Sequence, residues 1–334
     1  VFDQARHAHS ERPRRLIFAE GAHPYVLQAA QQVISEQIAE PILIGNPEDI
    51  EHWIKHLGLR MRIGKDVQVF DQTNDPRIPA LTDEYLHLVE RRGVPPSHAR
   101  RVIGAGATVV AGLLLRRGDA DAMICGIVGR YLAHLRHVRQ VIGQHSAVNA
   151  LASLTGIILP SGPLFMADTH VNHQPDAETL AEITLMAAEE VQRFGITPKI
   201  ALLSHSNFGT RDDESSRKMR RVLALVNDLA PDLEIEGEMH AEAAISTFIR
   251  EDNFPNSRLE GPATLLIMPT LDAAHISFTL LRSVTKSVSI GPMVLGTARP
   301  AHILTTSATV RSLLNMSAVA IADSVRDEQT SGQT

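Results

Sequence analysis

The sequence has very little cysteine, since Cys125 is the only one in 334 residues. A single cysteine excludes an internal disulfide framework and fits a reducing compartment. Basic residues are not in excess either, because 32 Lys and Arg stand against 38 Asp and Glu and give a net charge of −6. Nucleic-acid-binding domains are usually basic, so this balance argues against a nucleic-acid partner.

Long apolar runs are also missing. No stretch approaches the roughly 18 residues that a membrane helix needs, and the polar N-terminus lacks the apolar core of a secretory signal. We therefore expect a cytoplasmic protein without a membrane partner. The chain starts at Val1 rather than at Met, which suggests a piece excised from a longer polypeptide.

Several motifs of known chemistry are absent. The paired glycines of residues 104–112 lack the third glycine and the strand context of a dinucleotide fingerprint, and no P-loop or Gly-x-Ser-x-Gly elbow is present. His170 and His173 lie close to Asp168, but no second pair at a ligand-like spacing accompanies them, so we expect no metal site. Cys125 lies in an apolar segment and is expected to be an inert buried thiol.

Short β-branched runs alternate with helical patterns along nearly the whole chain. Residues 14–21 and 39–46 read as buried strands, and residues 23–37 between them have apolar positions at helical spacing. This rhythm predicts a mostly parallel sheet with helices on both faces. The length predicts about two domains.

Polar residues gather where five predicted strands end. These ends read ADTHVN, SHSNFGT, EGEMH, PTLDAAH and LTTS. In open α/β sheets, ligands bind outside the carboxyl ends of strands, so we expect one small-molecule cleft built from several loops. Asp168, Glu238 and Asp272 could serve proton transfer there, and nothing in the sequence selects among them.

The turn at residues 304–309, LTTSAT, leads from a strand-like segment into a helix. Hydroxyls beside the free N–H groups of a helix N-terminus form a ready anion site. Thr305 and Thr306 are placed to cap this helix and to hydrogen-bond a ligand. By itself the turn fits a catalytic site, a binding site or a well-capped helix.

A second candidate for anion binding is the basic segment GRYLAHLRHVR. It carries Arg130, Arg136 and Arg139 just after a predicted strand. Clustered guanidinium groups suit phosphate or carboxylate recognition. A solvated basic helix face fits the same pattern, and composition leaves both readings open.

Longer segments, taken together, resemble the phosphate acetyl/butyryltransferases. FGITPKIALLSHSNFG, PDLEIEGEMHAEAA and IGPMVLGTARPAHIL are among them, and the resemblance runs in order from about residue 14 to residue 324. More narrowly, RRGDADAMICGIVGRYLAHLRHVRQVIG and LTTSATVRSLLNM resemble the phosphotransacetylase-like C-terminal domain of the large bacterial NADP-dependent malic enzymes.

The resemblance implies a three-layer α/β/α two-domain fold like that of isocitrate and isopropylmalate dehydrogenases. It implies that residues 1–142 and 298–334 form the first domain and residues 143–297 the second, with a ligand cleft between them. It also implies a homodimer or a larger homo-oligomer, held together largely by the second domain.

In active phosphotransacetylases, the turn equivalent to residues 304–307 reads Leu-Ser-Arg-Gly, and an acid proposed as the base follows. Here the Ser position is Thr305, the Arg position is Thr306 and the acid position is Ser312. Arg136 matches another arginine of the family, although His137 replaces the proline after it. The resemblance therefore implies that the catalytic cation and the base are lost, and no catalytic residue is expected.

The implied function is regulatory binding of acetyl-CoA, or another CoA thioester, in the old active cleft. No cofactor is expected in this chain. NADP and Mg²⁺ or Mn²⁺ belong to the upstream malic enzyme domains, which oxidatively decarboxylate malate to pyruvate and are the expected partners. The expected ligand-binding residues are Arg130, Arg136, Ser204, Ser206, Asn207, Pro269, Asp272, Thr305, Thr306 and Arg311.

Two alternatives stay open at this point. The first is a working phosphate acetyltransferase, which converts acetyl-CoA and phosphate to acetyl phosphate and CoA with Arg130, Arg136 or Arg311 as the cation. The second is a stand-alone dehydrogenase, which would share the fold but lacks a dinucleotide fingerprint.

Overall fold

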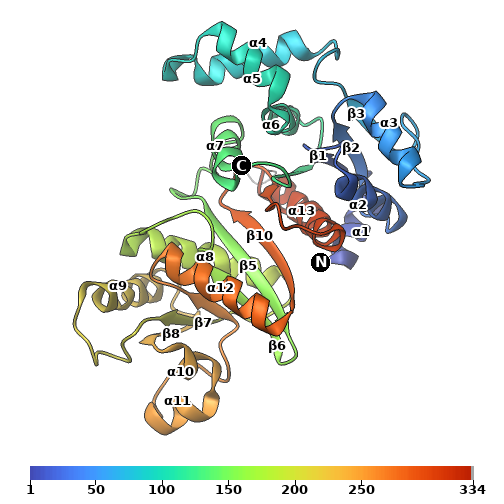
Figure 1. The fold of residues 1–334 in the computed structure, drawn as a ribbon. Coiled ribbons are helices and arrows are strands. Elements are labelled where there is room, and N and C mark those ends of the chain that lie inside the picture. The colour runs from blue at the N-terminus through green and yellow to red at the C-terminus, as the bar shows by residue number, and fades with distance from the viewer. Residues whose placement is uncertain (332–334) are drawn as a thin grey trace. The chain divides into compact units, whose positions relative to one another are not determined.

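The computed structural model describes residues 1–331, which divide into two compact units (Figure 1). Unit 1 comprises Val1–His145 and Thr297–Thr334, of which the last three residues lie outside the described part. Unit 2 comprises Ser146–Gly296. The chain therefore leaves unit 1 once and returns to it at the C-terminal end.

Unit 1 is built on a parallel sheet whose strands lie in the order β11-β4-β1-β2-β3. All four pairings along this order are parallel. The central strands are almost wholly buried, as expected for a sheet with helices on both faces. The strands are β1 (Arg15–Phe18), β2 (Glu40–Ile44), β3 (Gln68–Phe70), β4 (Ala122–Cys125) and β11 (Ala301–Ile303).

Helices cover both faces of this sheet. Helix α13 contacts β1, β4 and β11 and packs against α1 and α2, whereas α6 contacts β1 and β4 and α7 contacts β11. Helix α6 is buried along most of its length and ends at Gly118, whose φ is +81°. The helices are α1 (Phe2–Glu11), α2 (Pro24–Ser35), α3 (Pro47–His56), α4 (Ile78–Val89), η1 (Glu90–Arg92), α5 (Pro96–Ala105), α6 (Ala107–Arg117), α7 (Tyr131–Val141) and α13 (Val310–Ser331).

Unit 2 has a mixed sheet in the order β10-β5-β6-β9-β7-β8. The pairs β10–β5 and β5–β6 are antiparallel, and the other pairs are parallel. These antiparallel pairs depart from the expected mostly parallel sheet. Strands β5 and β6 are joined by a short turn, and only antiparallel neighbours can be joined in this way. The strands are β5 (Ala152–Leu159), β6 (Gly162–Ala167), β7 (Lys199–Leu203), β8 (Glu234–Met239), β9 (Leu265–Ile267) and β10 (Val288–Leu295).

Alternate residues of this sheet face different helices. Phe165 packs against Phe194 at the end of α8, with ring centroids 5.3 Å apart, whereas its neighbour Met166 belongs to a core cluster with Phe278 of α12. Helices α8 and α9 thus cover one face, and α12 covers the other together with α10 (Figure 1). The helices are α8 (Ala177–Arg193), α9 (Glu214–Leu229), α10 (Ala241–Ile245), α11 (Thr247–Asn253) and α12 (Leu271–Thr285).

The predicted fold class is confirmed, because both units are α/β layers with helices on the two faces of a sheet. Among the described residues no single helix is long and apolar enough to cross a membrane, and α5 with α6, bent at 95°, meets the length and composition test only as a pair.

Candidate functional site

Three neighbouring parallel strands of unit 1 end at the same edge of the sheet. Register places Ile303 of β11 beside Cys125 of β4, and Phe18 of β1 beside Ile124. The residues that follow these strands are therefore neighbours. The Leu304 N–H donates to the Cys125 carbonyl at 2.7 Å. The loops after β1, β4 and β11 consequently form one continuous edge, where ligands of open α/β sheets bind.

Glu20 is the carboxyl group at this edge. Its Oε1 accepts a hydrogen bond of 3.0 Å from the Gly126 N–H, and its side chain is only 15% exposed. No Lys or Arg among the described residues forms an ion pair with it. Burial raises the pKa of Glu20 to about 7, although hydrogen bonds from backbone N–H groups, chiefly that of Gly126, oppose the rise. The prediction from sequence did not single this residue out.

The turn after β4 is fixed onto helix α7 by His134. Its Nε2 lies 2.7 Å from the Val128 carbonyl and its Nδ1 lies 2.8 Å from the Thr108 hydroxyl. A carbonyl only accepts, so Nε2 carries the proton and Nδ1 accepts from Thr108. Burial lowers the pKa of His134, which favours this neutral form. Arg130 ends the turn with an exposed side chain at the N-cap of α7.

The hydroxyl-rich turn after β11 differs from the expectation in one respect. Helix α13 begins at Val310, so Thr309 caps it rather than Thr305 or Thr306. The Thr309 hydroxyl accepts from the Ser312 N–H at 3.2 Å, and the Ser312 hydroxyl accepts from the Thr309 N–H at 2.7 Å. This reciprocal pair is a capping box.

Two consequences follow for this turn. The Ser312 hydroxyl is engaged in the cap, whereas Thr306 is exposed and has no hydrogen bond among the described side chains. The Thr305 hydroxyl lies 2.9 Å from that of Ser307. Arg311, in the first turn of α13, is exposed.

An open pocket of about 400 Å³ lies between η1 and α7. Three guanidinium groups line it, those of Arg92, Arg136 and Arg139, and none of them has an ion pair or a side-chain hydrogen bond with the described residues. The remaining lining residues are Leu132, Leu135 and Gln140. Three unpaired cations beside apolar side chains suit a ligand that carries phosphate or carboxylate groups next to an apolar part.

The structure thus joins Arg136 and Arg139, which belong to the basic segment named from sequence as a candidate for anion binding, with Arg92, which the sequence did not single out. The sequence holds a further signal for the α7 arginines. Between Asp121 and Asp168 the sequence has no Asp or Glu. Arginines in so long a stretch without acids have few local partners. Arg92 carries no such signal, because it reaches the pocket from a distant part of the chain.

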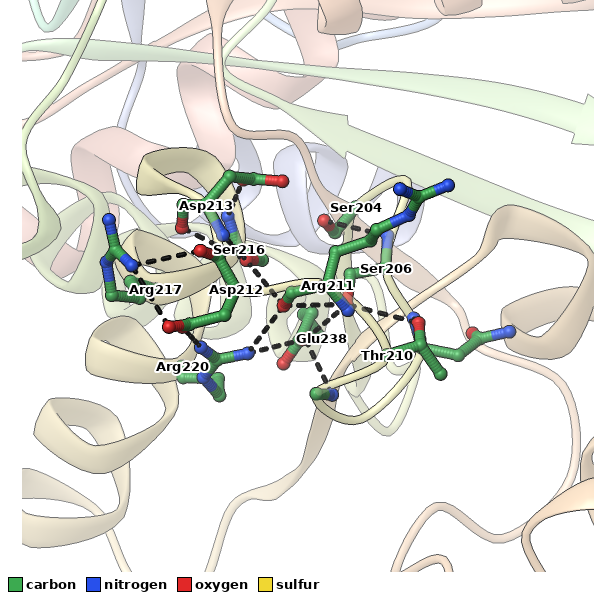
Figure 2. A network of polar contacts seen from close by, with 12 residues as sticks. Ser204, Ser206, Thr210, Arg211, Asp212, Asp213, Ser216, Arg217, Arg220 and Glu238 are labelled. Atoms are coloured by element: carbon green, nitrogen blue, oxygen red, sulfur yellow. Dashed lines mark hydrogen bonds and ion pairs between the residues drawn. The ribbon is translucent and has the colours of Figure 1, made fainter.

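In unit 2, a buried carboxylate organises the loop after β7 (Figure 2). Glu238, at the end of β8, is 0% exposed. Its Oε1 accepts from the Ser206 hydroxyl at 2.8 Å, the Gly209 N–H at 2.9 Å and Arg220 at 3.1 Å. Arg220, on α9, also donates to Asp212 at 2.7 Å. The network ties the loop of residues 204–213 to α9 and β8.

Three residues of this loop that were expected to bind ligand form hydrogen bonds within the protein. Ser206 is fully buried, and its hydroxyl is used by Glu238. The Asn207 side-chain oxygen accepts from the His240 N–H at 2.6 Å, and the Ser204 hydroxyl accepts from the Ser206 N–H at 3.2 Å. All three side chains therefore help to shape the loop.

Asp168 is likewise engaged within the protein. It is 3% exposed, and its Oδ1 accepts from the Ser153 N–H and hydroxyl and from two backbone N–H groups of the loop after β6. Its Oδ2 accepts from the N–H and the side-chain amide of Asn172. These hydrogen bonds fix the loop after β6 onto β5.

The last two expected residues of unit 2 follow β9. The Pro269 carbonyl accepts from the Lys218 ammonium group at 2.6 Å, and the Pro175 carbonyl accepts from it at 3.1 Å. Lys218 thereby joins the loops after β6 and β9. Asp272 is exposed in the first turn of α12.

Cys125 is buried and free, and its thiol lies 3.8 Å from the His302 carbonyl. Burial raises the pKa of this thiol well above its usual range, which keeps it protonated and unreactive. Among residues 1–331, no group of three or more His, Cys, Asp or Glu side chains is placed to hold a metal ion.

The phosphate acetyl/butaryl transferase family matches residues 1–321, which is nearly the whole chain. This chain belongs to that family. The resemblance seen in the sequence is confirmed at the level of the family.

The curated relatives that are similar in sequence to this chain include malic enzymes. The chain is 47% identical over 324 residues to the NADP-dependent malic enzyme of Escherichia coli (strain K12), covering 97% of this chain and 42% of that protein. It is 48% identical over 324 residues to the NAD-dependent malic enzyme of Rhizobium meliloti (strain 1021), with the same coverage. The chain thus spans less than half the length of these relatives.

More distant relatives carry the transferase name. Phosphate acetyltransferase of Synechocystis sp. is 28% identical over 302 residues, covering 90% of this chain and 43% of that protein. Among solved structures, a phosphotransacetylase from Streptococcus pyogenes has a TM-score of 0.88 at 23% identity, covering 97% of this chain and 98% of the other. EutD phosphotransacetylase from Staphylococcus aureus has a TM-score of 0.83 at 21% identity, covering 96% and 98%. These similarities confirm the phosphotransacetylase-like fold.

Proposed function

We propose that this chain is a regulatory domain of a malic enzyme that binds acetyl-CoA, or a related CoA thioester, without transferring its acyl group. The parent polypeptide would oxidatively decarboxylate malate to pyruvate in the cytoplasm. NADP is the proposed dinucleotide, although the names of the relatives include both NADP and NAD. The dinucleotide and a divalent metal would be held by domains outside this chain.

The phosphates of a CoA thioester suit the cations of unit 1. Arg92, Arg136 and Arg139 line one pocket and are unpaired, so they are free to form charge-assisted hydrogen bonds with phosphate oxygens. Leu132 and Leu135 in the same pocket suit the apolar part of such a ligand. Arg130 and Arg311 are exposed further cations on α7 and α13.

The proposed loss of catalysis rests on one observation, the residue types in the turn after β11. Residues 304–310 contain no ionisable side chain, and the Ser312 hydroxyl is engaged in the capping box. A general base is typically worth about 10²–10⁴-fold in rate. A preorganised cation or donor is worth about 10²–10³-fold. A site that lacks both retains cations for binding but few means of catalysis.

Acyl binding can regulate the malic enzyme only if it favours one state of the assembly over another. In a homodimer, the contacts between subunits can transmit this coupling. On α12, Ile276, Leu280 and Val284 are 62%, 60% and 73% exposed and lie one helical turn apart. This apolar stripe on unit 2 supports the expected dimer, because monomeric surfaces rarely expose contiguous apolar patches.

Dimerisation is tested by analytical ultracentrifugation of a Leu280→Asp variant. A charge in the middle of the stripe should shift the sedimentation from dimer to monomer. Thr285→Gln, on the opposite side of the same helix, is the matched control and should leave the dimer intact. A Leu280→Asp variant that remains dimeric would place the interface elsewhere.

The binding proposal is tested by calorimetric titration of the chain with acetyl-CoA and by an assay for acetyl-CoA formation from acetyl phosphate and CoA. We expect binding without turnover. Arg136→Met should weaken binding roughly 10–100-fold, since a hydrogen bond to a charged group is worth about 1.5–3 kcal/mol. Arg100→Met removes an exposed arginine that does not line the pocket and is the matched control.

An active phosphate acetyltransferase is the second candidate, and the same experiment separates the two. Turnover within about tenfold of an ordinary phosphotransacetylase would overturn the regulatory proposal. Such activity would assign the cation role to Arg130, Arg136 or Arg311. Absence of binding to any CoA species would overturn both candidates.

A further inference from the structure

Glu20 lies at the edge of the unit 1 sheet where the carboxyl ends of β11, β4 and β1 meet. The three strands β11, β4 and β1 are adjacent, and the residues that follow them form one row: Leu304, Gly126 and Glu20. The hydroxyl turn of Thr305–Ser307 begins one residue further along β11. Because neighbouring strands lie about 4.8 Å apart, this turn is roughly 10 Å from Glu20.

No Lys or Arg of residues 1–331 forms an ion pair with Glu20. From α7, His134 faces it with Nδ1 3.9 Å from Oε1, and burial lowers the pKa of this histidine. From β4, Cys125 lies beside it as a buried thiol whose pKa is raised well above the usual range. His23 lies in the loop before α2, and burial lowers the pKa of its imidazole. At neutral pH these neighbours are uncharged, so Glu20 is the group at this edge that can change charge.

Hydroxyl and N–H groups also lie along this edge. Thr108 of α6 and the Thr305–Ser307 turn present hydroxyls, and Gly126 presents its N–H. Hydroxyls and N–H groups can receive an anionic ligand, whereas an ionised Glu20 would repel it. Protonation of Glu20 removes that repulsion.

We propose that Glu20 links ligand binding to proton uptake: when an anionic group of the ligand occupies the Thr305–Ser307 turn, the Glu20 carboxyl takes up a proton from solvent. The step forms one O–H bond on Glu20 and consumes one H⁺, with no change in any other bond. The inference rests on the proposed binding of a CoA thioester by unit 1, and it places one anionic group of that ligand at this turn. It adds that Glu20 sets the pH range in which binding is tight.

The expected size of the effect follows from the separation. One negative charge at roughly 10 Å, at an effective dielectric constant of about 20, raises the pKa of a carboxyl by about one unit. Since burial already raises the pKa of Glu20 to about 7, the shift falls in the physiological range. At pH 7.5 the free protein would have about a quarter of its Glu20 protonated and the complex about three quarters, so binding would take up about half a proton.

The test is calorimetric titration with acetyl-CoA at pH 7.5 in two buffers with different heats of ionisation. The difference in observed heat gives the number of protons taken up. We expect the wild-type chain to take up about half a proton more than Glu20→Gln. The glutamine keeps an oxygen that can accept from the Gly126 N–H, and a far-UV circular dichroism spectrum checks its fold. Protons bound by the ligand's own phosphate are the same for both proteins and cancel.

Two further variants assign the proton. Glu20→Asp retains a carboxyl and should retain the uptake. His134→Asn removes the nearest other titratable group and should also retain it. Equal uptake by wild type and Glu20→Gln overturns the inference, as does a loss of uptake confined to His134→Asn.

The failure of this inference is distinguishable from the failure of the proposed function. Acetyl-CoA binding with no Glu20-dependent uptake overturns only the proton linkage. If acetyl-CoA does not bind, the proposed function is overturned, and inorganic phosphate serves as the second probe of the same turn. Absence of Glu20-dependent uptake with phosphate as well overturns the linkage.

Discussion

Glu20 should make the stability of unit 1 fall as pH rises, whatever ligand the protein binds. In the folded protein the pKa of Glu20 is about 7, against 4.5 for an unburied glutamate. The folded state therefore binds the proton more tightly than the unfolded state does. This contribution to stability is fully present below pH 4.5 and is lost as pH rises through about 7.

The magnitude follows from the shift of about 2.5 pKa units, the difference between about 7 and 4.5. At about 1.36 kcal/mol per unit, this corresponds to about 3 kcal/mol in full, of which about 2.5 kcal/mol is lost between pH 5 and pH 8. The free energy of unfolding of wild type minus that of Glu20→Gln should fall by this amount over that range.

Urea denaturation followed by tryptophan fluorescence is the assay. Trp53 is the only tryptophan and lies on α3, so its fluorescence reports unit 1 alone. Glu40→Gln is the control, because it removes an exposed carboxyl from β2 of the same sheet. A wild-type minus Glu20→Gln difference that is constant, or that grows with pH, would refute the reasoning.

Three other outcomes follow from the structure. Gly126→Ala should destabilise unit 1 by about 2–4 kcal/mol in the Trp53 assay, because φ of Gly126 is +95° and the new Cβ would lie 2.4 Å from the Leu304 carbonyl oxygen. Gly118→Ala should cost only about 1 kcal/mol in the same assay, because φ is +81° but the space around the new Cβ is open. Arg220→Met should cost unit 2 about 3–5 kcal/mol by circular dichroism, since it leaves a buried carboxylate without its cation, and adding Glu238→Gln should recover part of the loss; full additivity would contradict this. His170, whose pKa burial lowers to about 4, should make unit 2 lose up to about 3 kcal/mol as pH falls from 6.5 towards 4, and His170→Asn should abolish this acid-side slope.

The layered fold could be predicted from sequence because its signals are local. The apolar spacing of residues 23–37 predicts the helix that the structure has as α2, and the glycine after ATVVAGLLLRR predicts where α6 ends. The antiparallel β5–β6 pair was the exception to the parallel expectation. Its short connection decides the direction of pairing, whereas the apolar pattern of the strands does not.

The site could be predicted only in part, because its geometry depends on register and on distant contacts. Thr305 and Arg136 were singled out from sequence, Thr305 as a hydroxyl in the turn before a helix and Arg136 as one of a cluster of arginines after a strand, and the resemblance to a known family pointed to both. The place of Glu20 beside Gly126 depends on the pairing of β1 with β4, across about a hundred residues of chain. Ser206 shows the converse, since its position at a strand end suggests ligand contact, but packing directs its hydroxyl to Glu238.

The return of the chain to unit 1 has a consequence for synthesis on the ribosome. Strand β4 has β1 on one side, and its other neighbour, β11, is made only after all of unit 2. Until then, β4 presents the apolar sequence Ala-Met-Ile-Cys along an unpaired edge, and the sheet lacks α13, which contacts β1 and β4. Unit 2 can therefore reach its native state first, while the emerging unit 1 is the part that offers an unpaired strand and apolar surface to chaperones.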